Sequence, residues 1–83
     1  MPVIHPSLFI VMKHFPDRKD AVRQMYRTSK SFQDICRNYS KCSEALRYWA
    51  ESEDEHAPER EKEYATLLHE LELEIINSLE NPP

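Results

Sequence analysis

Six large or apolar side chains between residues 31 and 49 recur at alternating intervals of three and four positions. This spacing is typical of a helix that buries one seam against another helix, and it limits the possible folds more than any other feature of the chain. The six are Phe32, Ile35, Tyr39, Cys42, Leu46 and Trp49. Ser31 precedes the seam and Asp34 follows Ser31 by three positions, which is the spacing of a capping box. We therefore predict a long helix that begins at Ser31.

A second amphipathic helix is predicted after Pro58. Proline is favoured in the first turn of a helix, and the glutamates that follow it lie where the helix dipole favours negative charge. The apolar positions beyond it form one broad stripe with a period of about 3.6 residues. They are Tyr64, Leu67, Leu68, Leu71, Ile75 and Leu79. Because the acidic connector 52–57 is short, we expect the helices 31–52 and 58–80 to pack antiparallel as a hairpin.

The segment before the hairpin predicts an apolar arm followed by a short helix. Phe15-Pro16-Asp17 is typical of a helix start, and the narrow apolar face beyond it places a helix near 16–28 within the segment 15–30. Residues 1–14 form the arm, in which the run from Leu8 to Met12 is apolar on every side. We expect a short helix or an irregular segment there, covered by this subunit's hairpin or by a neighbour's.

A chain of 83 residues forms one small helical domain, residues 1–83. It contains no glycine, which disfavours strand hairpins and phosphate-binding loops. Such a short chain buries little surface alone, so we predict an all-α protein that dimerises into a bundle. Leu73 and Ile76 lie off the main stripe, where a second subunit or the arm would pack. The predicted partner or dimer contacts are Leu8, Phe9, Ile10, Met12, Trp49, Leu73 and Ile76.

The net charge of −4 is divided unevenly along the chain. Residues 13–48 carry nine Lys/Arg against four Asp/Glu, a net +5, whereas residues 49–83 carry two against eleven, a net −9. One interpretation is attraction between helices, both within one hairpin and between subunits. The alternative is a basic face that contacts the phosphates of a nucleic acid. The residues of that predicted basic face are Arg18, Lys19, Arg23, Arg27, Arg37 and Lys41.

The sequence contains no recognisable pattern of catalytic or metal-ligating residues. Cys36 and Cys42 are six positions apart on one predicted helix, which separates them by about 240° around its axis and prevents a disulfide between them. Neither belongs to a Cys-x-x-Cys pair, and the four histidines are scattered. We therefore expect no enzyme, no metal and no cofactor. Two cysteines, together with the lack of an apolar run of membrane-spanning length, predict a cytoplasmic location.

One resemblance to a known family rests on the spacing of the aromatic and apolar residues in the first half of the chain. Phe15-Pro16-Asp17, Val22, Met25, Phe32, Ile35 and Tyr39 are spaced in a way that resembles the YdcH-like small helical proteins. The resemblance covers residues 15–50 and implies a short helix followed by a long helical hairpin of unassigned biochemical role. The chain departs from that pattern at its two cysteines, at Tyr48-Trp49 and in its arm.

These features predict a small non-enzymatic protein-interaction or regulatory adaptor built on a helical hairpin. Its contact surface would combine the arm with the basic face. The alternative is a nucleic-acid-associated accessory factor that uses the basic face of residues 18–47. A third hypothesis, a metal or redox protein, requires an exposed and reactive Cys36 or Cys42.

Overall fold

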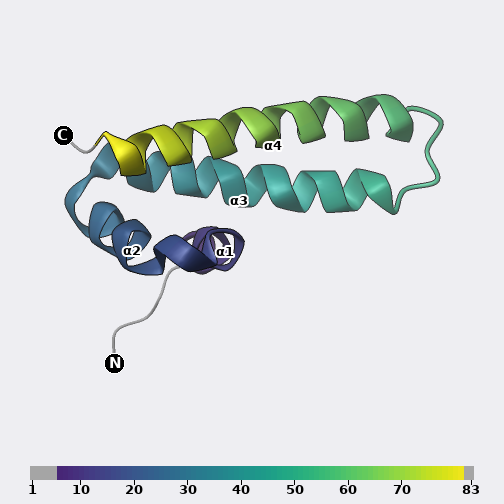
Figure 1. The fold of residues 1–83 in the computed structure, drawn as a ribbon. Helices are drawn as coiled ribbons and strands as arrows, with labels where there is room; N and C mark the ends of the chain where they lie inside the picture. Colours follow the sequence, from purple (N-terminus) through teal and green to yellow (C-terminus); the bar gives the residue numbers. More distant parts are fainter. Residues whose placement is uncertain (1–5, 82–83) are drawn as a thin grey trace.

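The computed structural model describes residues 6–81, which form four α-helices and one short 3₁₀ turn (Figure 1). In chain order these elements are α1 (Pro6–His14), η1 (Pro16–Arg18), α2 (Lys19–Thr28), α3 (Lys30–Ala50) and α4 (Ala57–Glu80). No strand occurs within residues 6–81, so the predicted all-helical class is confirmed.

The two long helices lie side by side and run in opposite directions (Figure 1). Residues 51–56 reverse the chain between them. In this connector the Asp54 carboxylate accepts a 2.8 Å hydrogen bond from the backbone N–H of His56, and the Ser52 hydroxyl accepts one from the N–H of Asp54. These side-chain oxygens accept hydrogen bonds from backbone N–H groups that have no helical partner in the connector. No described residue has a positive φ, so the reversal needs no glycine.

The core lies where α1, α2 and α4 meet α3. Figure 1 shows α1 and α2 together on one side of α3, and both pack against it. Phe32, Tyr39 and Ile75 are the largest fully buried side chains. The other members of the core cluster are Leu8, Val11, Met12, Val22, Met25, Cys36, Cys42 and Leu71. Burial of a large aliphatic or aromatic side chain contributes about 1.5–3 kcal/mol, so this cluster is what holds the four helices together.

The helix cap of α3 is Ser29 and not Ser31, so the predicted capping box is wrong. Ser29 has extended backbone angles (φ −127°, ψ 117°), and its hydroxyl accepts a 3.2 Å hydrogen bond from the N–H of Phe32. The N–H of Ser29 donates to the carbonyl of Met25 at 2.9 Å, which closes α2. Since Lys30 already begins the helix, Ser31 lies inside its first turn. One residue therefore ends α2 and caps α3.

The predicted arm is helical over the part that the structure describes, and residues 1–5 lie outside the described range. Within α1, Leu8, Val11 and Met12 are buried. Ile10 and His14 line a shared surface hollow with Ser43 of α3, which places α1 along this flank of α3. The structure thus decides between the two expected covers: α1 is covered by its own chain.

Candidate interaction site on the helical hairpin

The structure separates the predicted contact residues into exposed and buried ones. Within residues 6–81, four large apolar side chains remain exposed: Phe9 (59%), Tyr48 (64%), Leu67 (43%) and Leu73 (53%). Among the predicted partner contacts, Phe9 and Leu73 are therefore accessible, whereas Ile10, Trp49 and Ile76 are partly buried. Leu8 and Met12 are core residues of this chain, because α1 turns them inward. This corrects their assignment to an outer contact.

An open groove of about 340 Å³ lies between α3 and α4, and we call it the α3–α4 groove. Its lining combines apolar side chains with two polar ones at the edge. The lining residues are Asn38, Lys41, Cys42, Ala45, Tyr64, Leu67 and Leu71. The period of α4 predicts Leu67 on the buried stripe, but Leu67 is 43% exposed because it lies at the margin of that stripe. The pattern of a single helix does not predict such a groove.

The groove is open because α1 and α2 cover a different flank of α3. Ser43 lies next to α1, whereas Lys41 lines the groove. These two positions are about 200° apart around the helix axis, since each residue of an α-helix turns by about 100°. The first two helices therefore leave the groove face of the hairpin uncovered.

The two rims of the groove carry opposite charges. Lys41 lies on the α3 rim, and Arg37, one turn earlier, is exposed on the same side of the helix. On α4, Glu70 and Glu74 follow the groove residue Leu67 by three and seven positions, so they lie along the same edge, and both are exposed. The groove thus has a basic rim (Arg37 and Lys41) and an acidic rim (Glu70 and Glu74).

These opposite charges do not pair within the chain. Within residues 6–81, no ion pair joins α3 to α4. Arg37 instead lies 3.7 Å from Asp34 on its own helix, and Arg23 lies 3.9 Å from Asp20 on α2. In the described part of the chain, the predicted attraction between the two helices of the hairpin therefore produces no direct ion pair between them.

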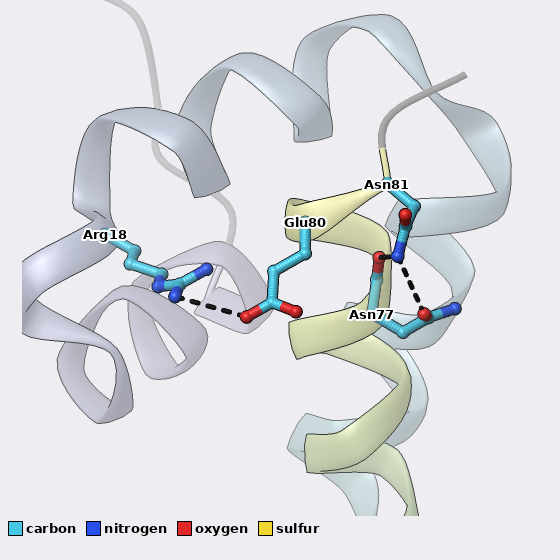
Figure 2. Close-up of polar contacts among 4 residues, drawn as sticks. All are labelled: Arg18, Asn77, Glu80 and Asn81. Atoms are coloured by element: carbon cyan, nitrogen blue, oxygen red, sulfur yellow. Dashed lines mark hydrogen bonds and ion pairs between the residues drawn. The ribbon is translucent and has the colours of Figure 1, made fainter.

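One ion pair does join distant parts of the chain, and Figure 2 shows it. The guanidinium of Arg18 in η1 lies 3.5 Å from the carboxylate of Glu80 at the end of α4. Both side chains are largely exposed, so a pair of this kind contributes about 0–1 kcal/mol. Next to it, the Asn81 side-chain amide donates to the carbonyl and the side-chain oxygen of Asn77 (Figure 2). Arg18, a member of the predicted basic face, thus pairs with a carboxylate of its own chain.

Both cysteines are free and buried, and they lie in different surroundings. Burial raises the pKa of the Cys36 thiol from its ordinary value of 9.0 to about 12. Cys42 borders the groove, and its thiol donates to the carbonyl of Tyr64 at 3.3 Å; burial raises its pKa as well. A protonated, covered thiol is a poor nucleophile and a poor metal ligand. The redox hypothesis lacks the exposed cysteine that it requires, and no cluster of metal-binding side chains occurs among the described residues.

A polar contact crosses the hairpin between Tyr39 and Glu72. The buried phenol donates a 3.2 Å hydrogen bond to Oε1 of Glu72, and the ring of His14 lies edge-on to Tyr39 with its centroid 5.5 Å away. Burial, together with the neighbouring carboxylate, raises the pKa of Tyr39 above its ordinary value. The phenol therefore stays a hydrogen-bond donor, and the contact connects α1, α3 and α4.

Over residues 6–81 the chain is thus an all-helical protein in which two short helices and a 3₁₀ turn pack mainly against α3 of a two-helix hairpin. No helix within residues 6–81 has both the length and the apolar character of a membrane span. Comparison of the chain with known protein families, with characterised proteins and with solved structures finds no match.

Proposed function

We propose that this chain is a small non-enzymatic interaction or regulatory adaptor that binds protein surfaces through its helical hairpin. The observation that carries the proposal is the α3–α4 groove, in which Leu67 remains 43% exposed beside Ala45 and Tyr64. Apolar surface in an open groove gains about 25 cal/mol per Å² when a partner removes it from water. A groove of this kind between two helices accepts the apolar face of a further helix.

The proposal includes self-association into a helical bundle. A chain of 83 residues buries only about 60% of the surface of its unfolded state, and a partner over the groove would add to that fraction. Phe9 and Leu73 do not line the groove, so they remain available to a different protein, with Ile76 partly accessible. The adaptor would then bind a copy of itself with one face and a second protein with others.

A matched pair of variants tests the adaptor function. We expect Leu67→Ser to weaken every association made through the groove, both self-association measured by light scattering and recovery of partners from a cell extract. Ala65→Ser changes an exposed position two residues away and serves as the control. Thermal unfolding should be similar for both variants, because Leu67 is only partly buried. If Leu67→Ser associates as well as the natural protein in both measurements, the groove does not act as a binding surface.

A nucleic-acid-associated role is the second candidate. All six residues of the predicted basic face are exposed, and Lys19, Arg27 and Lys41 make no ion pair within residues 6–81. Free cations of this kind bind phosphates by releasing counterions, so the affinity falls steeply with salt. Binding to a generic RNA that weakens strongly as salt is raised would favour this role over the adaptor.

We also propose a cytoplasmic location and a relationship to the YdcH-like small helical proteins. Free thiols at Cys36 and Cys42 suit a reducing compartment, which supports a cytoplasmic protein. The spacing of aromatic and apolar residues in 15–50 keeps the YdcH-like proteins as the proposed relatives. A short helix followed by two long ones, as found here in α2, α3 and α4, has the order of elements which that resemblance implies.

A further inference from the structure

We infer that the α3–α4 groove binds a second copy of this chain, with a two-fold axis parallel to the long helices, so that α3 of each copy lies over α4 of the other. This inference rests on the self-association proposed above and specifies its surface and its symmetry. Three features carry it: the uncovered groove face, the opposite charges of its rims and the exposed side chain of Leu67.

The uncovered face makes the pairing possible. α1 packs near Ser43, on the flank of α3 that points away from Lys41 and the groove. In the two-helix layer of α3 and α4, α1 and α2 pack mainly against α3 (Figure 1), and the groove side is left open to a partner. Two such layers stacked face to face form a four-helix bundle.

The charges of the rims select the symmetry. Two hairpins can stack face to face around a two-fold axis that runs either along the helices or across them. An axis across the helices places α3 over α3 and α4 over α4, so that basic rim meets basic rim and acidic rim meets acidic rim. An axis along the helices places α3 over the partner's α4. Only this second arrangement brings the basic rim of each copy onto the acidic rim of the other. The axis across the helices is disfavoured because like charges held together are destabilising.

The same axis also determines the register. A rotation about an axis parallel to the helices moves no residue along them, so each α3 residue meets the α4 residues that lie at its own level. Lys41 lies beside Leu67 and Leu71 in the groove lining, which places it over Glu70 of the other copy. Arg37, one turn earlier on α3, then lies over Glu74, one turn later on the antiparallel α4. Two ion pairs form on each side of the bundle without any adjustment of the helices.

Leu67 supplies the apolar contact at the centre. It stands on the edge of the groove at the level of Lys41 and is 43% exposed in the single chain. In the paired arrangement, Leu67 of each copy faces Lys41 and Ala45 of the other, where the groove offers a hollow of about 340 Å³. The contact is therefore reciprocal, as a two-fold interface requires.

Complementary charge reversals test the arrangement. Lys41→Glu places glutamate over Glu70 at both symmetry-related contacts, and Glu70→Lys places lysine over Lys41. We expect each variant alone to weaken self-association by about tenfold at low salt. An equimolar mixture of the two variants restores both contacts, because each chain then supplies the charge that the other lacks. The masses are measured by light scattering over a range of protein concentrations, for each variant and for the mixture.

The mixture separates this inference from an effect inside one chain. Each variant keeps its altered charge within its own hairpin, so only pairing between chains explains a recovery on mixing. Lys19→Glu and Glu61→Lys change exposed charges outside the groove lining, and we expect neither to alter the mass. The double variant Lys41→Glu/Glu70→Lys should also pair as the natural chain does.

Several outcomes would overturn the inference. A natural chain that stays monomeric at all concentrations rules out the dimer. Unchanged dimers for both single variants rule out this surface. Stronger pairing of Lys41→Glu with the natural chain than of the natural chain with itself points to the axis across the helices, because residue 41 would then face its own copy. In each case a partner protein that is lost with Leu67→Ser but retained with Lys41→Glu leaves the adaptor function standing, so that the two proposals fail separately.

Discussion

The phenol of Tyr39, in the middle of α3, donates a hydrogen bond of 3.2 Å to Oε1 of Glu72 on α4. Tyr39 is fully buried, whereas Glu72 lies partly exposed at the edge of the hairpin. The aromatic ring therefore fills the core while its hydroxyl reaches a carboxylate that water can also contact. Since the ring meets His14 as well, this residue links the packing of α1 to that of the hairpin.

Removing the Tyr39 hydroxyl should lower the free energy of unfolding by about 1 kcal/mol, the usual net contribution of one such hydrogen bond. Tyr39→Phe keeps the ring, and Glu72 can bind water in place of the lost donor. Urea unfolding monitored by circular dichroism measures the change. Tyr48→Phe removes a hydroxyl from an exposed ring on the same helix and should have no measurable effect. Equal stabilities for the natural chain and Tyr39→Phe would show that the contact is not stabilising.

The second prediction concerns the N-terminal cap of α3, because either of two serines, two positions apart, could serve as that cap. We expect Ser29→Ala to destabilise the protein by about 1 kcal/mol, because the N–H of Phe32 then loses its hydrogen-bond acceptor. Ser31→Ala should change the stability much less, since Ser31 lies exposed inside the first turn. Thermal or urea unfolding of the two variants compares them directly. A larger loss for Ser31→Ala than for Ser29→Ala would place the cap at Ser31.

The third prediction compares two aliphatic residues on α4, Ile75 and Leu73, that are two positions apart. Ile75 is 0% exposed, and Ile75→Ala should destabilise the chain by about 2–5 kcal/mol. Leu73→Ala should stay within about 0.5 kcal/mol of the natural chain, because Leu73 is 53% exposed. If Ile75→Ala does not fold, Ile75→Val should still show a loss of about 0.5–1.5 kcal/mol. A loss at Leu73 that grows with protein concentration would mean that Leu73 is covered by a partner chain.

Alkaline pH should destabilise the fold through Cys36. Burial raises the pKa of this thiol from 9.0 to about 12, so between these values the folded chain keeps a proton that the unfolded chain releases. The contribution of the protonated Cys36 thiol to the free energy of unfolding is therefore fully present below pH 9 and is lost as the pH rises toward 12. The slope approaches about 1.4 kcal/mol per pH unit for one group.

Cys36→Ala provides the comparison for this pH dependence. Its stability will be lower at neutral pH because of the smaller side chain, but the free energy of unfolding should fall less steeply above pH 9 than in the natural chain. Urea unfolding at several pH values measures both slopes. Parallel curves for the two proteins would show that Cys36 does not titrate with folding. Cys42 and Tyr39 also have raised pKa values, so a residual slope in Cys36→Ala is expected.

The helical character of this chain and the positions of its long helices follow from local sequence patterns. The apolar periods around Phe32 and Leu71 are local properties, and the missing glycine acts at every position, so both can be recognised without a structure. Helix ends were less well defined, because Ser29 and Ser31 are equally good caps in isolation. Which serine serves depends on the backbone angles at the junction with α2.

Which apolar residues are covered depends on how the helices pack against one another. Leu8 and Met12 lie in a run that is apolar on every side, and nothing local reveals that α1 packs against α3 on the flank of Ser43. The same placement leaves the other side of the hairpin open, so that Leu67 is exposed although it belongs to the stripe of α4. Burial depends on what other helices contact, and this is a property of the whole fold that the pattern of a single helix cannot contain.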